Sequence, residues 1–303
     1  MTGDLLYLSQ PFAQHALLAA TFVAITCGLI GPFVVTRGMA FAVHGTSELA
    51  FTGAAAGLLV ANNPVAGALC GALLVAIIIG LLGARERERD SSIGVILAFG
   101  LGVGVLLLSH YHGFATAATN ILFGNIFGVS NNQLRGLVAI GIVVIAVMAV
   151  IYRPLLFASV DPDVAGARGV RTRALGIVFL LVLAFTVTEA AQVVGTLLVL
   201  SLAITPAAAA QRLSPNPLVV TGLAVAFALV ASVGGILASL ASTTVKPTVF
   251  VTSFSFAIYV LARIVSPLVL SRRAHSAVGP VKLGARFSVC DASPSRASGP
   301  PKP

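Results

Sequence analysis

His44 and Glu48 lie one helical turn apart in the stretch "GMAFAVHGTSELAFTG", residues 38–53. On a helix, positions i and i+4 share one face, with Cβ atoms about 5 to 6 Å apart. An imidazole and a carboxylate at this separation can coordinate one ion of zinc, manganese or iron. Thr46 and Ser47 add hydroxyl groups nearby. A structural hydrogen bond between the pair, or from each to a neighbouring helix, is the alternative interpretation.

The composition around this pair indicates an integral membrane protein. Hydrophobic residues make up 58% of the chain, charged residues 9%, and the mean hydropathy is +1.04, unlike a soluble domain. The net charge of +9 comes from basic residues scattered between apolar runs, and Trp is absent. We therefore expect no nucleic-acid partner. An ionisable group inside a membrane costs about 2.5 to 3.5 kcal/mol, so His44 and Glu48 require a partner or a polar cavity.

The apolar runs predict an all-α, polytopic bundle of about eight or nine transmembrane helices, because a bilayer core requires about 20 apolar residues per helix. The predicted spans are residues 15–35, 39–60, 64–83, 93–109, 134–152, 174–190, 194–211, 217–240 and 247–270. The apolar but interrupted stretch 112–133 is predicted to be interfacial or re-entrant. Residues 1–273 form the transmembrane domain, and the Ser-, Pro- and Gly-rich residues 274–303 a disordered cytoplasmic tail.

Arginines predict the orientation, since short cytoplasmic loops collect basic residues. One set lies at alternate ends of the spans: Arg37, Arg85, Arg87, Arg89, Arg153, Arg168, Arg171, Arg173, Arg212, Arg272 and Arg273. The opposite ends carry only Arg135 and Lys246. The first set is predicted to be cytoplasmic, which places the N-terminus outside. The chain is therefore expected to be a multi-pass protein of the cell (plasma or inner) membrane.

Small-residue spacings predict close helix packing. They are "GAAAG" (residues 53–57), "GALCG" (67–71) and "GLGVG" (100–104). Such spacings let helix backbones approach closely in lipid, where apolar burial does not drive association.

Glu189, in "TVTEAAQVVG", is a second ionisable residue in an apolar run. Fifteen residues of helix from the start of its predicted span correspond to about 22 Å, which places it near the outer boundary of the membrane. It is a candidate for the pathway or a gate, and an interfacial position is the alternative.

The segment "SVDPDVAGARGVRTR" predicts a short cytoplasmic helix. Asp161 suits the N-cap, Pro162 the first helical position, and Asp163 the first turn. Gly169 can end the helix in a left-handed conformation. Taken alone, these features are also consistent with a capped connector.

The sequence lacks the GxxxxGK[ST] phosphate loop and any catalytic triad or pair of catalytic carboxylates, so we expect no enzyme activity of its own. An energised transporter would need a separate ATPase. An ATP-independent metal channel or secondary transporter is an alternative, since a divalent cation moving inward gains about 4.6 kcal/mol at 100 mV.

Several segments together resemble the permease subunit of zinc/manganese-type ATP-binding-cassette (ABC) importers. They are "GPFVVTRGMAFAVHGTSELAFTGAAAG", "RERERDSSIGVILAFGLGVGVLLLS", "NILFGNIFGVS", "SVDPDVAGARGV" and "VVGTLLVLSLAITPAAAA". The resemblance extends over residues 11–270. His44 stands where that family has Asp, Glu48 where it has His, and Thr52 where it usually has Pro.

The resemblance implies that His44 and Glu48 line a translocation path for a divalent metal ion, which is cargo rather than a permanently bound cofactor. It also implies that the segment with Asp161, Pro162, Asp163 and Gly169 docks on an ABC ATPase subunit. The expected partners are that ATPase, an extracytoplasmic metal-binding protein, a second copy of the chain and membrane lipid. An ABC permease for a metal chelate or an organic cofactor is the alternative within this class.

Overall fold

A computed structural model describes residues 11–82, 86–111, 120–196, 198–241 and 245–277. Every regular element in these ranges is a helix. The helices are α2 (Pro11–Thr36), α3 (Ala40–Ala61), α4 (Pro64–Leu82), α5 (Glu86–Ser109), η1 (Ile126–Gly128), α7 (Asn131–Val160), α8 (Pro162–Ala167), α9 (Thr172–Val194), α10 (Val199–Ala203), α11 (Thr205–Leu213), α12 (Pro217–Ala241) and α13 (Pro247–Ala277).

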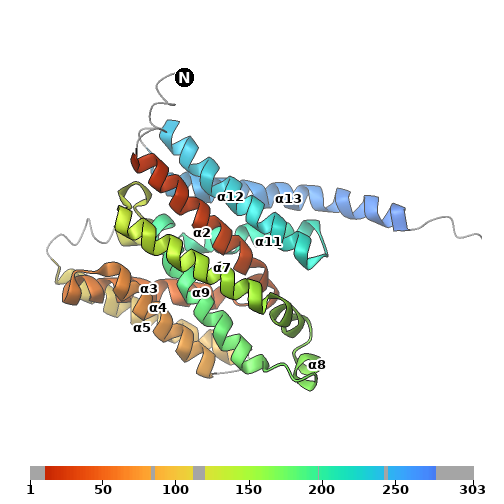
Figure 1. The fold of residues 1–303 in the computed structure, drawn as a ribbon, viewed down its shortest axis with the longest axis horizontal. Helices are drawn as coiled ribbons and strands as arrows, with labels where there is room; N and C mark the ends of the chain where they lie inside the picture. The colour runs from red at the N-terminus through yellow and green to blue at the C-terminus, as the bar shows by residue number, and fades with distance from the viewer. Residues whose placement is uncertain (1–10, 83–85, 112–119, 197, 242–244, 278–303) are drawn as a thin grey trace, which may run out of the picture.

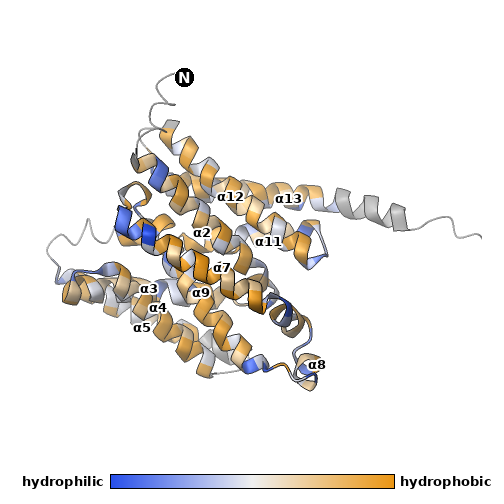
Figure 2. Ribbon diagram, in the orientation of Figure 1, coloured by the Kyte–Doolittle hydropathy of each residue, from blue (hydrophilic) through white to orange (hydrophobic). Residues whose placement is uncertain are grey.

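Six of the described helices are long and apolar enough to cross a membrane: α2, α4, α7, α9, α12 and α13. Two shorter apolar stretches, Ile93–Ser109 and Val199–Leu213, accompany them. Helix α3 has 22 residues, but its polar residues, His44 and Glu48 among them, lower its hydropathy. Hydrophobic residues cover the long helices, and hydrophilic residues gather near helix ends (Figure 2). The predicted all-α membrane bundle is confirmed.

Helices α2 and α9 form the interior of the bundle, and α9 packs against α2, α3, α4 and α7. Helix α2 packs against α7 and α12, and α3 packs against α4, α5 and α9. Figure 1 shows α3, α4 and α5 grouped on one side of α9, with α8 protruding at one end of the molecule. Contacts between helices distant in sequence therefore build one bundle around α2 and α9.

Helices α3 and α4 meet through four glycines. An ideal Cβ on Gly53 would lie 2.2 Å from the carbonyl oxygen of Gly67, and one on Gly71 would lie 2.3 Å from the carbonyl oxygen of Leu49. Gly57 also faces Gly67, with an ideal Cβ 2.8 Å from its Cα. These positions have no room for a side chain, so the packing predicted from "GAAAG" and "GALCG" is confirmed.

The predicted span 194–211 is not one continuous helix. Helix α9 ends at Val194, Gly195 has a φ of +93°, and the chain resumes as α10 and then α11. Pro206 lies in the first turn of α11, at the second break. Apolar residues dominate the run, so hydropathy alone does not reveal the breaks, which lie at a glycine with positive φ and at a proline.

The described residues of the stretch 112–133, which is predicted to be interfacial or re-entrant, pass across the break at Gly195. Gly124 has a φ of +75°, and an ideal Cβ on it would lie 2.7 Å from the nitrogen of Gly195. The amide of Thr196 donates to the carbonyl of Ile121 at 3.3 Å. Lys246 lies over the Phe123 ring, 5.3 Å from its centroid. Residues 121–124 and 193–196 thus form a backbone-to-backbone crossing.

Several helix ends differ from the predicted span ends. Helix α5 begins at Glu86, before the predicted start of this span at residue 93, because Glu and Arg are good helix formers. Helix α7 extends to Val160, beyond the predicted end at residue 152. Helix α13 ends at Ala277, and residues 278–303 of the predicted tail lie outside the described residues.

Candidate functional site

His44 and Glu48 lie on α3, in the part of the helix that faces the bundle. The Glu48 side chain is buried, with 4% of its surface exposed, and His44 is half-buried. The Nδ1 atom of His44 and the Oε2 atom of Glu48 are both buried without a hydrogen-bond partner among the described residues. Buried polar atoms are normally paired, so both atoms remain available to a ligand.

The hydroxyl groups beside this pair bond to backbone carbonyls. Thr46 donates to the carbonyl of Ala42 in its own helix at 2.7 Å. Ser47 donates across the bundle to the carbonyl of Thr196, in the break after α9. Thr52 donates to the carbonyl of Gly100 on α5 at 2.6 Å. The hydroxyls of Ser47 and Thr52 therefore hold α3 to the break after α9 and to α5, while His44 and Glu48 keep atoms that are unpaired among the described residues.

The Glu189 side chain is fully buried inside the bundle, with an exposed fraction of 0%. The hydroxyl of Thr26 on α2 donates to its Oε2 atom at 3.3 Å. Its Oε1 atom has no hydrogen-bond partner among the described residues and approaches Gly141 on α7. Glu189 thus extends from α9 toward α2 and α7. It does not share a helix with His44 and Glu48, which lie on α3. In the described part of the chain, no three His, Cys, Asp or Glu side chains gather closely enough to hold a metal.

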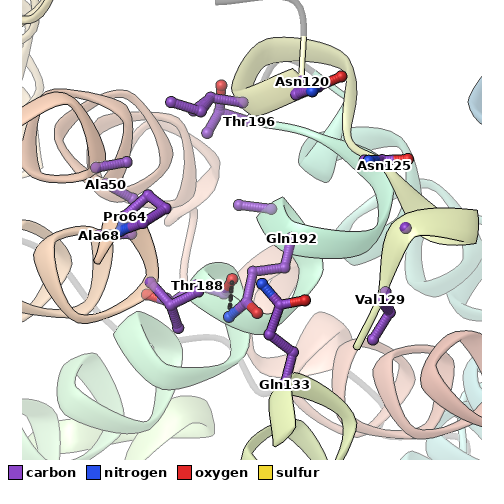
Figure 3. A pocket seen from close by; sticks show the side chains of 15 residues that line it. Ala50, Pro64, Ala68, Asn120, Asn125, Val129, Gln133, Thr188, Gln192 and Thr196 are labelled. Atoms are coloured by element: carbon purple, nitrogen blue, oxygen red, sulfur yellow. Dashed lines mark hydrogen bonds between the residues drawn. The ribbon is translucent and has the colours of Figure 1, made fainter. Parts of the chain in front are cut away.

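A cavity of about 210 Å³ lies beside the backbone crossing, at the predicted outer end of α3, α4 and α9 (Figure 3). Its polar lining residues are Asn120, Asn125, Gln133, Thr188, Gln192 and Thr196. The sequence alone does not predict this group, because amide side chains are common near helix ends and these six residues come from separate segments. Their only signal is the polar residues that interrupt the apolar stretch at 120–133.

The predicted short helix is present as α8. The Oδ1 atom of Asp161 accepts a hydrogen bond from the amide of Val164 at 3.0 Å, Pro162 begins the helix, and Asp163 lies in its first turn. Gly169 has a φ of +85°, and the amide of Val170 donates to the carbonyl of Ala165 at 3.0 Å. This bond belongs to the motif that commonly ends helices at a left-handed glycine. Most side chains of α8 are exposed.

Among the described residues, the chain is an apolar helical bundle with a broken inner helix, unpaired polar atoms inside and an exposed capped helix at one end, an arrangement expected of a membrane-spanning transport subunit. The chain matches the ABC 3 transport family over residues 9–266 and belongs to it.

Known relatives and one solved structure agree with this assignment. The chain is 32% identical over 230 residues to the manganese transport system membrane protein MntC of Halalkalibacterium halodurans, covering 76% of this chain and 79% of that protein. It is 28% identical to the high-affinity zinc uptake system membrane protein ZnuB of Haemophilus influenzae, covering 78% of this chain and 92% of that protein. The structure of PsaBC from Streptococcus pneumoniae in complex with Fab matches at a TM-score of 0.80 and 25% identity, covering 90% of this chain and 99% of that chain.

Three predictions are confirmed by these comparisons. The chain is the permease subunit of an ABC transporter, it resides in the membrane as a multi-pass protein, and it is a transport subunit rather than an enzyme. ATP hydrolysis in this family belongs to a separate subunit, so an ATP-independent channel or secondary transporter is not favoured.

Proposed function

We propose that this chain forms the translocation path of an ABC importer for a divalent transition-metal ion such as manganese, zinc or iron, with His44 and Glu48 as ligands on that path. The observation that carries the proposal is the pair of unpartnered atoms, Nδ1 of His44 and Oε2 of Glu48, one turn apart on α3. The names of the relatives support the cargo class, since MntC belongs to a manganese system and ZnuB to a zinc system.

Two protein ligands suit a path better than a storage site. A closed site with four protein ligands retains its metal, whereas conduction requires binding weak enough for release. The remaining positions around the ion would be filled by water or by a ligand from another helix or another copy. The imidazole and the carboxylate also favour transition metals over alkali ions.

The order of the two ligands along α3 provides the sharpest test. His44→Ala and Glu48→Ala should each abolish most metal uptake with nearly unchanged protein level, because each removes a ligand. The double variant His44→Asp with Glu48→His keeps one carboxylate and one imidazole on the same face and should retain uptake, with a changed preference among metals. Thr46→Ala is the matched control, since the Thr46 hydroxyl bonds only within its own helix.

Uptake of manganese, zinc and iron should be measured in vesicles that contain the chain and its ATPase partner. Parent-level uptake of all three metals by both alanine variants would refute the metal site. Loss of both variants from the membrane, together with loss of the double variant, would instead identify the pair as a structural hydrogen bond.

For the working assembly we propose two copies of this chain, two ATPase subunits and an extracytoplasmic metal-binding protein. The absent phosphate loop requires an ATPase partner, and the exposed α8 offers a surface for it. We assign Asp161, Pro162, Asp163 and Gly169 to this coupling surface. We also propose that Glu189 has a secondary role on the translocation path. Arg168, Arg171 and Arg173 are exposed near α8 and suit contact with lipid phosphates.

A further inference from the structure

The cavity beside the backbone crossing has an exposed mouth and a buried floor. Asn120, Asn125 and Gln133 at the mouth are exposed. Thr188 and Thr196 at the floor have exposed fractions of 1% and 2%. Gln192 is half-buried between them, and its Nε2 atom donates to the carbonyl of Thr188 at 3.5 Å (Figure 3). The polar side chains therefore continue from solvent into the bundle.

The chemistry of the lining fits a cation that keeps its water. Carboxamide and hydroxyl oxygens accept hydrogen bonds from the waters of a hydrated ion, and none of the described lining residues is charged. The volume of about 210 Å³ far exceeds the roughly 10 to 15 Å³ that one water needs. Uncharged oxygen ligands hold a divalent ion weakly, which suits a site that passes it on.

A hydrogen bond connects the floor of the cavity to α3, the helix that carries His44 and Glu48. The Oγ1 atom of Thr196 is buried without a hydrogen-bond partner among the described residues, and Thr196 lines the cavity. The carbonyl of the same residue accepts the hydrogen bond from Ser47, the residue before Glu48. One residue therefore faces the cavity with its side chain and holds α3 with its backbone.

We propose that this amide-lined cavity receives the hydrated divalent cation from the outer side, before the cation loses water to His44 and Glu48. This inference rests on the proposed function. Gln133 and Gln192 act as positioning residues through the water shell of the ion, and Thr196 marks the passage toward α3.

The test is the concentration dependence of manganese and zinc uptake in vesicles that contain the chain and its ATPase partner, with the extracytoplasmic metal-binding protein present on the outer side. The double variant Gln133→Leu with Gln192→Leu should raise the KM about tenfold with Vmax near that of the parent, since it removes two carboxamides that would bond to the water shell of the ion. It also removes the bond from the Ser130 amide to Gln133 Oε1 in the capping box of α7, so the protein level is measured beside uptake. Gln192→Glu should lower the KM, because a carboxylate attracts the cation. Asn132→Leu is the matched control, since Asn132 adjoins Gln133 but does not line the cavity.

The outcomes separate this inference from the proposed function. Parent KM values in both the double variant and Gln192→Glu would overturn the cavity proposal, even where His44→Ala and Glu48→Ala abolish uptake. A fall in Vmax at unchanged KM would also overturn it, by showing a structural role. If the double variant does not accumulate, Gln192→Glu alone decides by its KM. Uptake that survives His44→Ala and Glu48→Ala would refute the proposed function itself.

Discussion

Glu189 illustrates at the scale of one residue how a carboxylate is kept inside an apolar bundle. Its side chain is fully buried, Thr26 is its hydrogen-bond partner, and its second oxygen is unpaired among the described residues. Ionisable residues inside membranes are costly and usually functional. The position between α2, α7 and α9, rather than at the surface, favours the role on the path over the interfacial alternative.

We therefore expect Glu189→Gln to reduce metal uptake several-fold while the protein level stays near that of the parent. The amide keeps the shape and can still accept the bond from Thr26, but it can neither ionise nor bind a cation as a carboxylate does. Uptake and membrane abundance should be measured together. Thr186→Val on the same helix is the control, since the Thr186 hydroxyl bonds only to the carbonyl of Val182; unchanged uptake in Glu189→Gln would leave Glu189 a packing residue.

The hydrogen bond from Thr26 to Glu189 should contribute measurably to the stability of the protein. Thr26→Val keeps the side-chain volume but removes the hydroxyl, which leaves the buried carboxyl group without its partner. Leaving a buried polar group unsatisfied costs about 1 to 3 kcal/mol, so the variant should unfold at a lower temperature in detergent. Thr21→Val is a suitable control, because Thr21 donates only to the carbonyl of Leu17. Equal thermal stability of the two variants would contradict this account.

Local residue patterns were predictable because one helix determines them. The shared face of His44 and Glu48 follows from helical spacing, and the cap of Asp161 follows from residue types within a single turn. The amide cavity was not predictable, since Gln133 and Gln192 meet only through the packing of α7 and α9. Neither glutamine differs from an ordinary residue near a helix end when the sequence is read alone.

At the scale of elements, the break after α9 shows where hydropathy is insufficient. Residues 194–211 are apolar enough for a span, and yet the backbone leaves the helix at Gly195. Irregular backbone is tolerated inside a membrane protein when its polar groups find partners. Here the amide of Thr196 bonds to Ile121, and its carbonyl accepts from Ser47. These partners are distant in sequence, so the break could not be predicted from the segment itself.

Helix α8 supports a prediction about coupling. Replacing both Asp161 and Gly169 by Leu removes the N-cap, worth about 1 kcal/mol, and forces a branched side chain into a left-handed conformation at about 1 to 2 kcal/mol. We expect ATP hydrolysis by the partner to continue while transport falls, with membrane insertion intact. Both rates should be measured in the reconstituted complex.

Gly166→Ala is the matched control for this experiment. Gly166 lies inside α8, and an ideal Cβ there meets nothing within 4 Å, so the variant should behave as the parent. If the double variant transported and hydrolysed ATP at parent rates, α8 would be only a connector between α7 and α9.

At the scale of the whole molecule, we predict that transport requires the assembly. The purified complex should contain two copies of this 30.8 kDa chain with two ATPase subunits, and metal should enter vesicles only when ATP reaches those subunits. Native mass measurement checks the stoichiometry, and uptake with and without ATP checks the energy source. Metal entry into vesicles that hold this chain alone, driven by membrane potential, would contradict the prediction.

The glycine contacts between α3 and α4 have a mechanical consequence. Backbones that touch without intervening side chains cannot slide or rotate past each other without a clash, so the pair is stiff, and α4 must follow any displacement of α3. Elsewhere on α3, Ser47 donates a hydrogen bond to the carbonyl of Thr196 in the break after α9. When the bundle changes shape, the helix that carries His44 and Glu48 should therefore move together with α4 as one rigid pair.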